Sequence, residues 1–355
     1  MKLDAFVDFY ASLNYNTPHP QGGTNVLRAF DVNNGFALNW VGLNGSIDPD
    51  PVGGTVQLRF GPGAQIYSAN DASIGLANVK QAFATYRPGG KDGAFTLDFG
   101  KFDQPFGSEV ADSHLNMNYT RSVLFNFAQP LYFTGVRADY VISPMVDLKL
   151  IAVNGWNRSV DNNLGKSFAA QLMLKPADQF IAYLGYMISP EQGETATVTP
   201  AAGGGTITTF DSDANTRFRH TIDAVFDINP TKEARVLING TYNTEQVLDA
   251  LGAKKTVSWY GANLAARYAI TDSFGASIRG EYFKDSDGFG LTGTVTNTDA
   301  TVIDGTLTLD IVPAPHFKIM FENRIDSCDR EIFPTPHTMV KTQITSTLGI
   351  IASTL

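Results

Sequence analysis

The stretch Leu3–Tyr15, which reads LDAFVDFYASLNY, alternates between two faces along its whole length. Its odd positions are apolar or aromatic, whereas its even positions include Asp4, Asp8 and Asn14. A period of two residues indicates a β-strand. The pattern outlasts the ~5–6 residues of an ordinary strand and reaches the ~9–11 residues that a membrane-spanning strand needs. The stretch therefore predicts a strand with one face toward lipid.

The same alternation recurs through the rest of the chain. It is clearest in Phe218–Ile228, Ala234–Tyr242, Phe274–Tyr282 and Phe317–Ile325. Weaker copies are Thr55–Phe60, Phe95–Phe99, Tyr132–Ile142, Ser167–Lys175, Tyr260–Tyr268, Thr301–Ile311 and Thr342–Ile350. Further strand-like segments lie near Phe36–Ile47, Val79–Tyr86, Leu148–Trp156 and Ile181–Met187. Together they predict about sixteen strands in an all-β, antiparallel transmembrane barrel.

The connections between these segments alternate in length. The short ones are 48–54, 88–93, 143–145, 176–179, 229–233, 271–273 and 313–315, and they are rich in Pro, Gly and Asp. The long ones are roughly 16–35, 68–77, 103–124, 157–166, 189–216, 244–256, 286–299 and 327–341. Short periplasmic turns that alternate with long extracellular loops are typical of outer-membrane barrels. We expect one domain over residues 1–355, both termini on the short-turn side, and a flexible loop tip at Thr195–Thr209.

A soluble β-sandwich or β-helix is the structural alternative, because alternation alone does not separate lipid from a protein core. Strand length, the alternation of loop length and the charges on the presumed inner face favour the barrel. The 24 Phe and 13 Tyr suit aromatic girdles at the membrane interfaces. No run approaches the ~18 apolar residues of a membrane helix. No signal peptide is visible at Met1, so export is inferred from the strand pattern.

Several segments resemble the OmpL-like β-barrel porin-2 family of bacterial outer-membrane proteins. They are Phe99–Gly107 (FGKFDQPFG), Asn118–Tyr140 (NYTRSVLFNFAQPLYFTGVRADY), Val153–Asn157 (VNGWN) and Asp161–Leu172 (DNNLGKSFAAQL). Ile332–Thr335 and Thr347–Gly349 are similar to the last hairpin of that family. The similarity covers most of the chain and is densest over 95–175. It implies a porin in the outer membrane of a bacterial cell, without an assigned solute.

The third long loop, 103–124, is the best candidate for a functional site. In porins with sixteen strands this loop commonly folds into the lumen, which is otherwise wide open. We expect a pore constriction formed by the charged residues of the loop, Asp103, Glu109, Asp112, His114 and Arg121. The wall facing it would carry the pore-lining residues Arg59, Arg137, Arg219, Arg235, Arg267, Arg279, Glu281, Glu322 and Arg324. Opposed acidic and basic groups in a narrow pore create a field that favours small polar solutes.

The function expected from these features is passive diffusion of small polar solutes and ions. The net charge of −9 favours a weak cation preference, although inward acids and arginines such as Arg279 and Glu281 are interleaved. The expected partners are membrane lipid, lipopolysaccharide, the solutes themselves and a homotrimer. Because 35 acidic residues exceed 26 basic ones, we expect no nucleic-acid partner.

Two other classes of barrel stay open. A structural or docking barrel would bind periplasmic or surface partners without open conductance. A barrel enzyme is disfavoured, because Asp112, Ser113 and His114 are adjacent in sequence and neighbouring side chains diverge. The single Cys328 and the five unclustered histidines point to no metal and no cofactor.

Overall fold

The computed structural model describes residues 1–19, 23–32, 34–200 and 206–354. Within these residues the chain forms a closed barrel of sixteen strands in which all neighbours pair. Every pairing is antiparallel, and β1 closes the barrel against β20. This confirms the predicted fold class.

The strands of the barrel are β1 (Lys2–Asn14), β2 (Asn34–Ile47), β3 (Val52–Phe60), β4 (Val79–Tyr86), β5 (Phe95–Asp103), β6 (Tyr132–Ser143), β7 (Val146–Val153), β8 (Ser167–Ala177), β9 (Phe180–Pro190), β12 (Phe218–Ile228), β13 (Ala234–Leu248), β14 (Lys254–Thr271), β15 (Phe274–Asp285), β16 (Ala300–Ala314), β17 (Phe317–Cys328) and β20 (Thr342–Ser353). Outside the wall lie β10 (Ala196–Pro200), β11 (Thr206–Phe210), β18 (Phe333–Pro334) and β19 (Met339–Val340). The helices are α1 (Pro62–Tyr67), α2 (Val123–Phe127) and α3 (Phe289–Thr292), with 3₁₀ turns η2 (Ala69–Ile74), η3 (Gly90–Asp92), η4 (Ser113–Leu115) and η5 (Ser212–Thr216).

The two faces of β1 have the predicted orientation. Leu3 and Val7 are exposed on the outer surface, whereas Phe6, Asp8 and Tyr10 are buried inside the barrel. Successive side chains of a strand point to opposite faces, so the outer face of the barrel is apolar and the inner face is polar. Among the described residues, no helix has the length and hydropathy to cross a membrane.

Two predicted loops differ in the structure. The sixth long loop was expected at 244–256, but β13 continues to Leu248 and β14 begins at Lys254, so this connection is short. The strands extend because both partners keep pairing, from Thr244 with Ser258 to Leu248 with Lys254. The loop tip expected at Thr195–Thr209 contains β10 and β11, which form a hairpin; residues 201–205 of it lie outside the described part of the chain.

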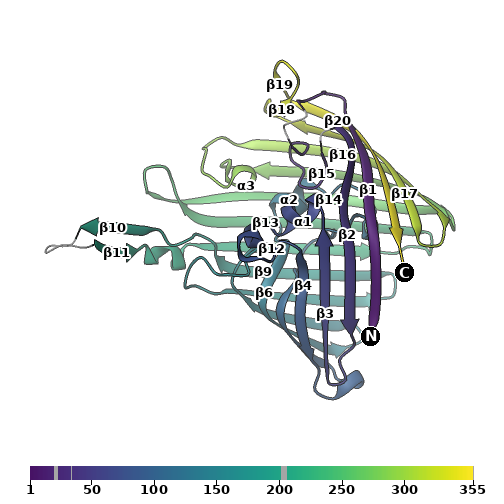
Figure 1. Cartoon of the computed structure of the whole chain (residues 1–355), viewed down its shortest axis with the longest axis horizontal. Helices are drawn as coiled ribbons and strands as arrows, with labels where there is room; N and C mark the ends of the chain where they lie inside the picture. Colours follow the sequence, from purple (N-terminus) through teal and green to yellow (C-terminus); the bar gives the residue numbers. More distant parts are fainter. Residues whose placement is uncertain (20–22, 33, 201–205, 355) are drawn as a thin grey trace.

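The connections after β1, β5 and β9 begin at the end of the barrel away from the termini. Figure 1 shows the N- and C-termini close together, while the β10–β11 hairpin projects from the opposite side of the molecule. Helices α1 and α2 lie in the middle of the barrel in the same view. The connection between β5 and β6 covers residues 104–131, which we call the third loop. The strand after it begins at Tyr132 as predicted, but the loop is longer than the predicted 103–124 because it also includes residues 125–131.

Candidate pore constriction

The third loop crosses the inside of the barrel and contacts inward-facing side chains on opposite walls. On one side, Ser113 donates a hydrogen bond to Asp8 of β1, at 2.9 Å. On the other side, Gln129 donates to Asn239 of β13, at 2.8 Å. The loop therefore spans the inside of the barrel between β1 and β13.

Asp112 is the centre of a buried charge cluster in this loop. Its carboxylate accepts two hydrogen bonds from Arg59 of β3, at 2.9 and 3.0 Å, and lies 3.3 Å from the amine of Lys80 on β4. Lys80 also pairs with Asp103 at the end of β5. Burial raises the pKa of Asp112, but Lys80 and Arg59 outweigh this effect and hold the pKa below its ordinary value. The cluster thus keeps an ionised carboxylate between two cations and fixes the loop to β3 and β4.

Glu109 fixes the loop to a different part of the wall. Its carboxylate lies 2.8 Å from Arg279 of β15 and accepts a hydrogen bond from the backbone nitrogen of Ser122, at 2.9 Å. The same guanidinium pairs with Asp304 of β16, at 3.2 Å. Arg279 therefore joins one loop carboxylate to one wall carboxylate.

Two wall carboxylates, Glu281 and Glu322, hold the backbone of the loop. Glu281 accepts from the nitrogens of Val123 and Leu124 at the start of α2, at 2.8 and 2.6 Å. Glu322 on β17 accepts from the nitrogen of Tyr119, at 2.6 Å, and from both the nitrogen and hydroxyl of the next residue. Hydrogen bonds to charged acceptors are stronger than neutral ones. These two residues were predicted to line the pore, and in the structure they bind the backbone of the third loop.

His114 faces the short-turn side of the loop. Its ring lies 4.5 Å from that of Phe6, and its carbonyl accepts a hydrogen bond from Lys318 of β17, at 3.2 Å. Burial lowers the pKa of His114, which favours the neutral ring.

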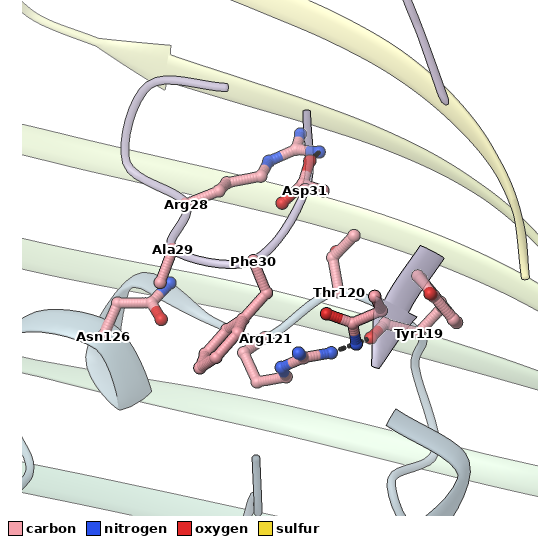
Figure 2. Close-up of a pocket in the computed structure, with 9 residues that line it drawn as sticks. Arg28, Ala29, Phe30, Asp31, Tyr119, Thr120, Arg121 and Asn126 are labelled. Atoms are coloured by element: carbon pink, nitrogen blue, oxygen red, sulfur yellow. Dashed lines mark hydrogen bonds and ion pairs between the residues drawn. The ribbon is translucent and has the colours of Figure 1, made fainter. Parts of the chain in front are cut away.

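Arg121 lies on the other side of the loop, below the connection between β1 and β2 (Figure 2). Its guanidinium stacks at 4.4 Å over Phe30 and donates to Ser113, at 2.8 Å, and to the carbonyl of Tyr119, at 2.7 Å. A cavity of about 10 Å³ beside it has room for about one water molecule. Arg28, from the same β1–β2 connection, pairs with Asp326 of β17 at 2.6 Å. This side of the lumen is therefore closely packed.

The predicted pore-lining residues divide into two groups by their surroundings. Arg59, Arg279, Glu281, Glu322 and Arg324 are buried against the third loop. Arg324 pairs with Asp304 and with Asp326, the latter at 2.7 Å. The members that remain partly exposed within the barrel are Arg137 paired with Asp98, Arg219 with Glu245, Arg235 with Asp227 and Arg267 with Asp310.

Two inward-facing glycines make room for aromatic side chains of the loop. A Cβ atom at Gly185 of β9 would collide with the ring of Phe106, and one at Gly349 of β20 would collide with the ring of Tyr119. The Tyr119 hydroxyl continues to Asp8 of β1, at 2.8 Å. These two glycines were not among the predicted site residues, although glycine at an inward position of a strand is a signal of close approach.

Two adjoining cavities remain between the third loop and the wall. The upper chamber, which lies beside Glu109 and Arg279, has a volume of about 220 Å³. The lower chamber, which lies beside the β12–β13 turn, has a volume of about 410 Å³. Both chambers are lined by Leu115, Asn116 and Met117 of the loop and by Arg235 of β13. The polar residues that line the upper chamber alone include Glu109, Asn263 and Arg279. Those that line the lower chamber alone include His114, Lys232, Glu233, Arg267, Asp310 and Lys318.

Comparisons with known proteins agree with this architecture. The chain matches the outer-membrane channel DcaP of Acinetobacter baumannii with a TM-score of 0.63 and 12% identity, over 99% of this chain and 96% of that one. It matches an anion-selective porin from Comamonas acidovorans with a TM-score of 0.61 and 11% identity, over 99% and 98%. It matches OmpT of Vibrio cholerae in its trimer form with a TM-score of 0.59 and 10% identity, over 99% and 98%.

At these identities the solved structures establish the shared fold. No curated protein sequence matches the chain. A model of the family described as "Putative beta-barrel porin-2, OmpL-like" matches residues 1–353. Since this match covers almost the whole sequence, the chain belongs to the β-barrel porin-2, OmpL-like family.

Proposed function

We propose that this outer-membrane channel passes small polar solutes and ions through the space between the third loop and the wall formed by β13–β17. Membership of a porin family makes the chain an outer-membrane channel for passive diffusion. The observation that supports the finer proposal is the pair of polar chambers beneath the loop. Charged and amide side chains in a hydrated passage favour small polar solutes over apolar ones. The residues that hold the loop are then Asp103, Glu109, Asp112 and Arg121, with His114 facing the lower chamber.

Conductance of the purified protein in a planar bilayer tests this proposal. We expect stepwise ion currents with no added substrate. A polar solute at high concentration should reduce the current only if it is small enough to enter the passage. A docking barrel would give no current by itself. The family and fold point to a channel rather than an enzyme. We therefore expect neither the wild type nor the His114→Ala variant to convert a solute chemically. The absence of current from a correctly folded barrel would contradict the proposal.

The outer surface of β1–β5 supports the proposal of a homotrimer in the bacterial outer membrane. Two shallow apolar depressions of about 550 and 580 Å³ lie on this face and share Leu3, Gly45 and Val56. The first also touches Gly54 and Ala84. Small side chains there would let a second copy approach closely, and a contact repeated around a threefold axis would close into a ring of three copies. The rest of the outer face would contact lipid and lipopolysaccharide.

Ala84→Trp is expected to weaken such a trimer, because the larger side chain would fill the depression that receives the neighbouring copy. Molecular mass in detergent would show a shift from trimer to monomer. Ala262→Trp is the matched control, since Ala262 is also exposed but lies on β14. An unchanged trimer in Ala84→Trp would place the contact elsewhere on the barrel, and a monomeric wild type would contradict a trimer altogether.

A further inference from the structure

We infer that the lower and upper chambers form a binding site for small, multiply charged oxyanions on the periplasmic side of the third loop. This inference rests on the proposed function, because the site lies in the proposed passage. The lower chamber is lined by the β12–β13 turn, which carries Lys232 and Glu233, and by the ends of β14, β16 and β17. It therefore lies on the side of the short turns.

The charges that line the lower chamber are mainly positive. Four cations, Lys232, Arg235, Arg267 and Lys318, line it together with two carboxylates, Glu233 and Asp310. A third carboxylate, Asp227, pairs with Arg235 from outside the lining. A cleft lined by an excess of one sign concentrates ions of the other sign.

The paired groups also present their positive partners to the chamber. The side chain of Arg235 is 49% exposed, whereas that of its partner Asp227 is 11% exposed. Arg267 is 33% exposed, whereas its partner Asp310 is 3% exposed. The carboxylates orient the guanidinium groups from behind and leave donor N–H groups facing water. Guanidinium groups match the geometry of carboxylate and phosphate oxygens.

Lys318 adds a cation that has no carboxylate partner within 4.0 Å among the residues that the structure describes. Its amine donates a hydrogen bond to the backbone carbonyl of His114, at 3.2 Å. A carbonyl carries no formal charge, so within the described ranges of the chain only the more distant Asp310 offsets the positive charge of the amine. An ammonium group also has two further donors for a ligand.

The upper chamber adds an amide side chain to the same site, beside Arg279 and its partner Glu109. Asn263 of β14 lines it and is only 3% exposed. Within the described part of the chain, neither its amide nitrogen nor its amide oxygen has a hydrogen-bond partner. Buried polar groups are normally hydrogen-bonded, so this amide is available to water or to a solute. The combined space of the chambers suits a small solute with two or three anionic groups.

The site predicts a different ion preference from the total charge. The net charge of −9 favours cations, whereas the lining of the chambers favours anions. The charges nearest the passage act over less than a Debye length, which is ~10 Å at about 0.1 M salt. We therefore expect the reversal potential in a potassium chloride gradient to show anion preference.

Block of single-channel current by oxyanions tests the inference. Citrate or inorganic phosphate, added at millimolar concentration to the short-turn side in about 0.1 M potassium chloride, is expected to reduce the current. The same addition from the side of the long loops should have a weaker effect, because the loop separates that side from the chambers. Glucose at equal concentration should leave the current nearly unchanged. Comparing citrate with phosphate shows whether carboxylate or phosphate oxygens are preferred.

Lys318→Gln is expected to raise the half-blocking concentration about tenfold, which corresponds to about 1.4 kcal/mol. Lys232→Gln, on the exposed turn, should raise it less and serves as a second variant if Lys318→Gln assembles poorly. The matched control is Lys175→Gln, because Lys175 pairs with exposed Asp178 near the β8–β9 turn and outside the chambers.

The outcomes separate the two proposals. A wild-type channel that carries no current without added oxyanion contradicts the proposed function. Normal current with no block by citrate or phosphate, or with equal block by glucose, contradicts the oxyanion site alone. The same half-blocking concentration in wild type, Lys318→Gln and Lys232→Gln also contradicts it.

Discussion

Deletion of Glu109–Met117 is expected to raise single-channel conductance severalfold. This segment includes Leu115, Asn116 and Met117, which line both chambers. It also includes Asp112, whose pairs with Arg59 and Lys80 hold the loop to β3 and β4. Without the segment the lumen approaches the open channel of a barrel of sixteen strands. Single-channel recording in a planar bilayer measures the change.

The deletion also leaves Arg59 and Lys80 without Asp112, so its effect on assembly needs a separate measurement. The electrophoretic mobility of heated and unheated samples in detergent shows whether the barrel is folded. Deletion of residues 196–210, the region of the β10–β11 hairpin, is the control, since this hairpin projects from the molecule (Figure 1). If the folded deletion variant conducted like wild type, the third loop would not limit the current.

Glu322→Ala is expected to release the middle of the third loop without shortening it. The substitution removes the acceptor of the backbone nitrogens of Tyr119 and Thr120 and of the Thr120 hydroxyl. A hydrogen bond to a charged group contributes about 1.5–3 kcal/mol, so docking of the loop should weaken by several kcal/mol. We expect greater open-channel noise and closure at lower applied voltage.

Glu331→Ala provides the matched control for Glu322→Ala. It removes the same charge from an exposed position in the connection after β17. Glu322→Gln keeps an acceptor oxygen and should restore part of the wild-type behaviour. Quiet, wild-type currents in a folded Glu322→Ala channel would show that other contacts suffice to hold the loop.

The barrel could be predicted from the sequence because lipid and lumen impose opposite demands on neighbouring residues. In Leu3–Tyr15 the alternation separates an apolar face from a polar one, and Leu3 and Val7 of the apolar face are exposed on the outer surface. The prediction that the third loop enters the lumen relied on resemblance and on strand number. The following strand was correctly predicted to begin at Tyr132, but the predicted loop stopped at 124 and omitted residues 125–131, which show no alternation and belong to the loop.

The partners of the charged groups could not be predicted. Asp112 and Arg59 are 53 positions apart, and Tyr119 and Glu322 are 203 apart. Their pairing depends on the path of the loop through the lumen, which no local pattern encodes. Burial of Arg59, Arg279 and Arg324 follows from that path, so alternation correctly placed these side chains inside the barrel without showing that the loop covers them.

The contact of Tyr119 with both ends of the sheet has a consequence for assembly. Its ring lies against Gly349 of β20, and its hydroxyl bonds to Asp8 of β1, so one loop side chain bridges the seam between the last and the first strand. A slip of one residue in a strand reverses its faces, and it would bring Leu348 or Ile350 against the ring instead of the glycine. The position of Tyr119 thus disfavours misregistered closure, so the packing of the third loop is coupled to the register of the two strands that close the barrel.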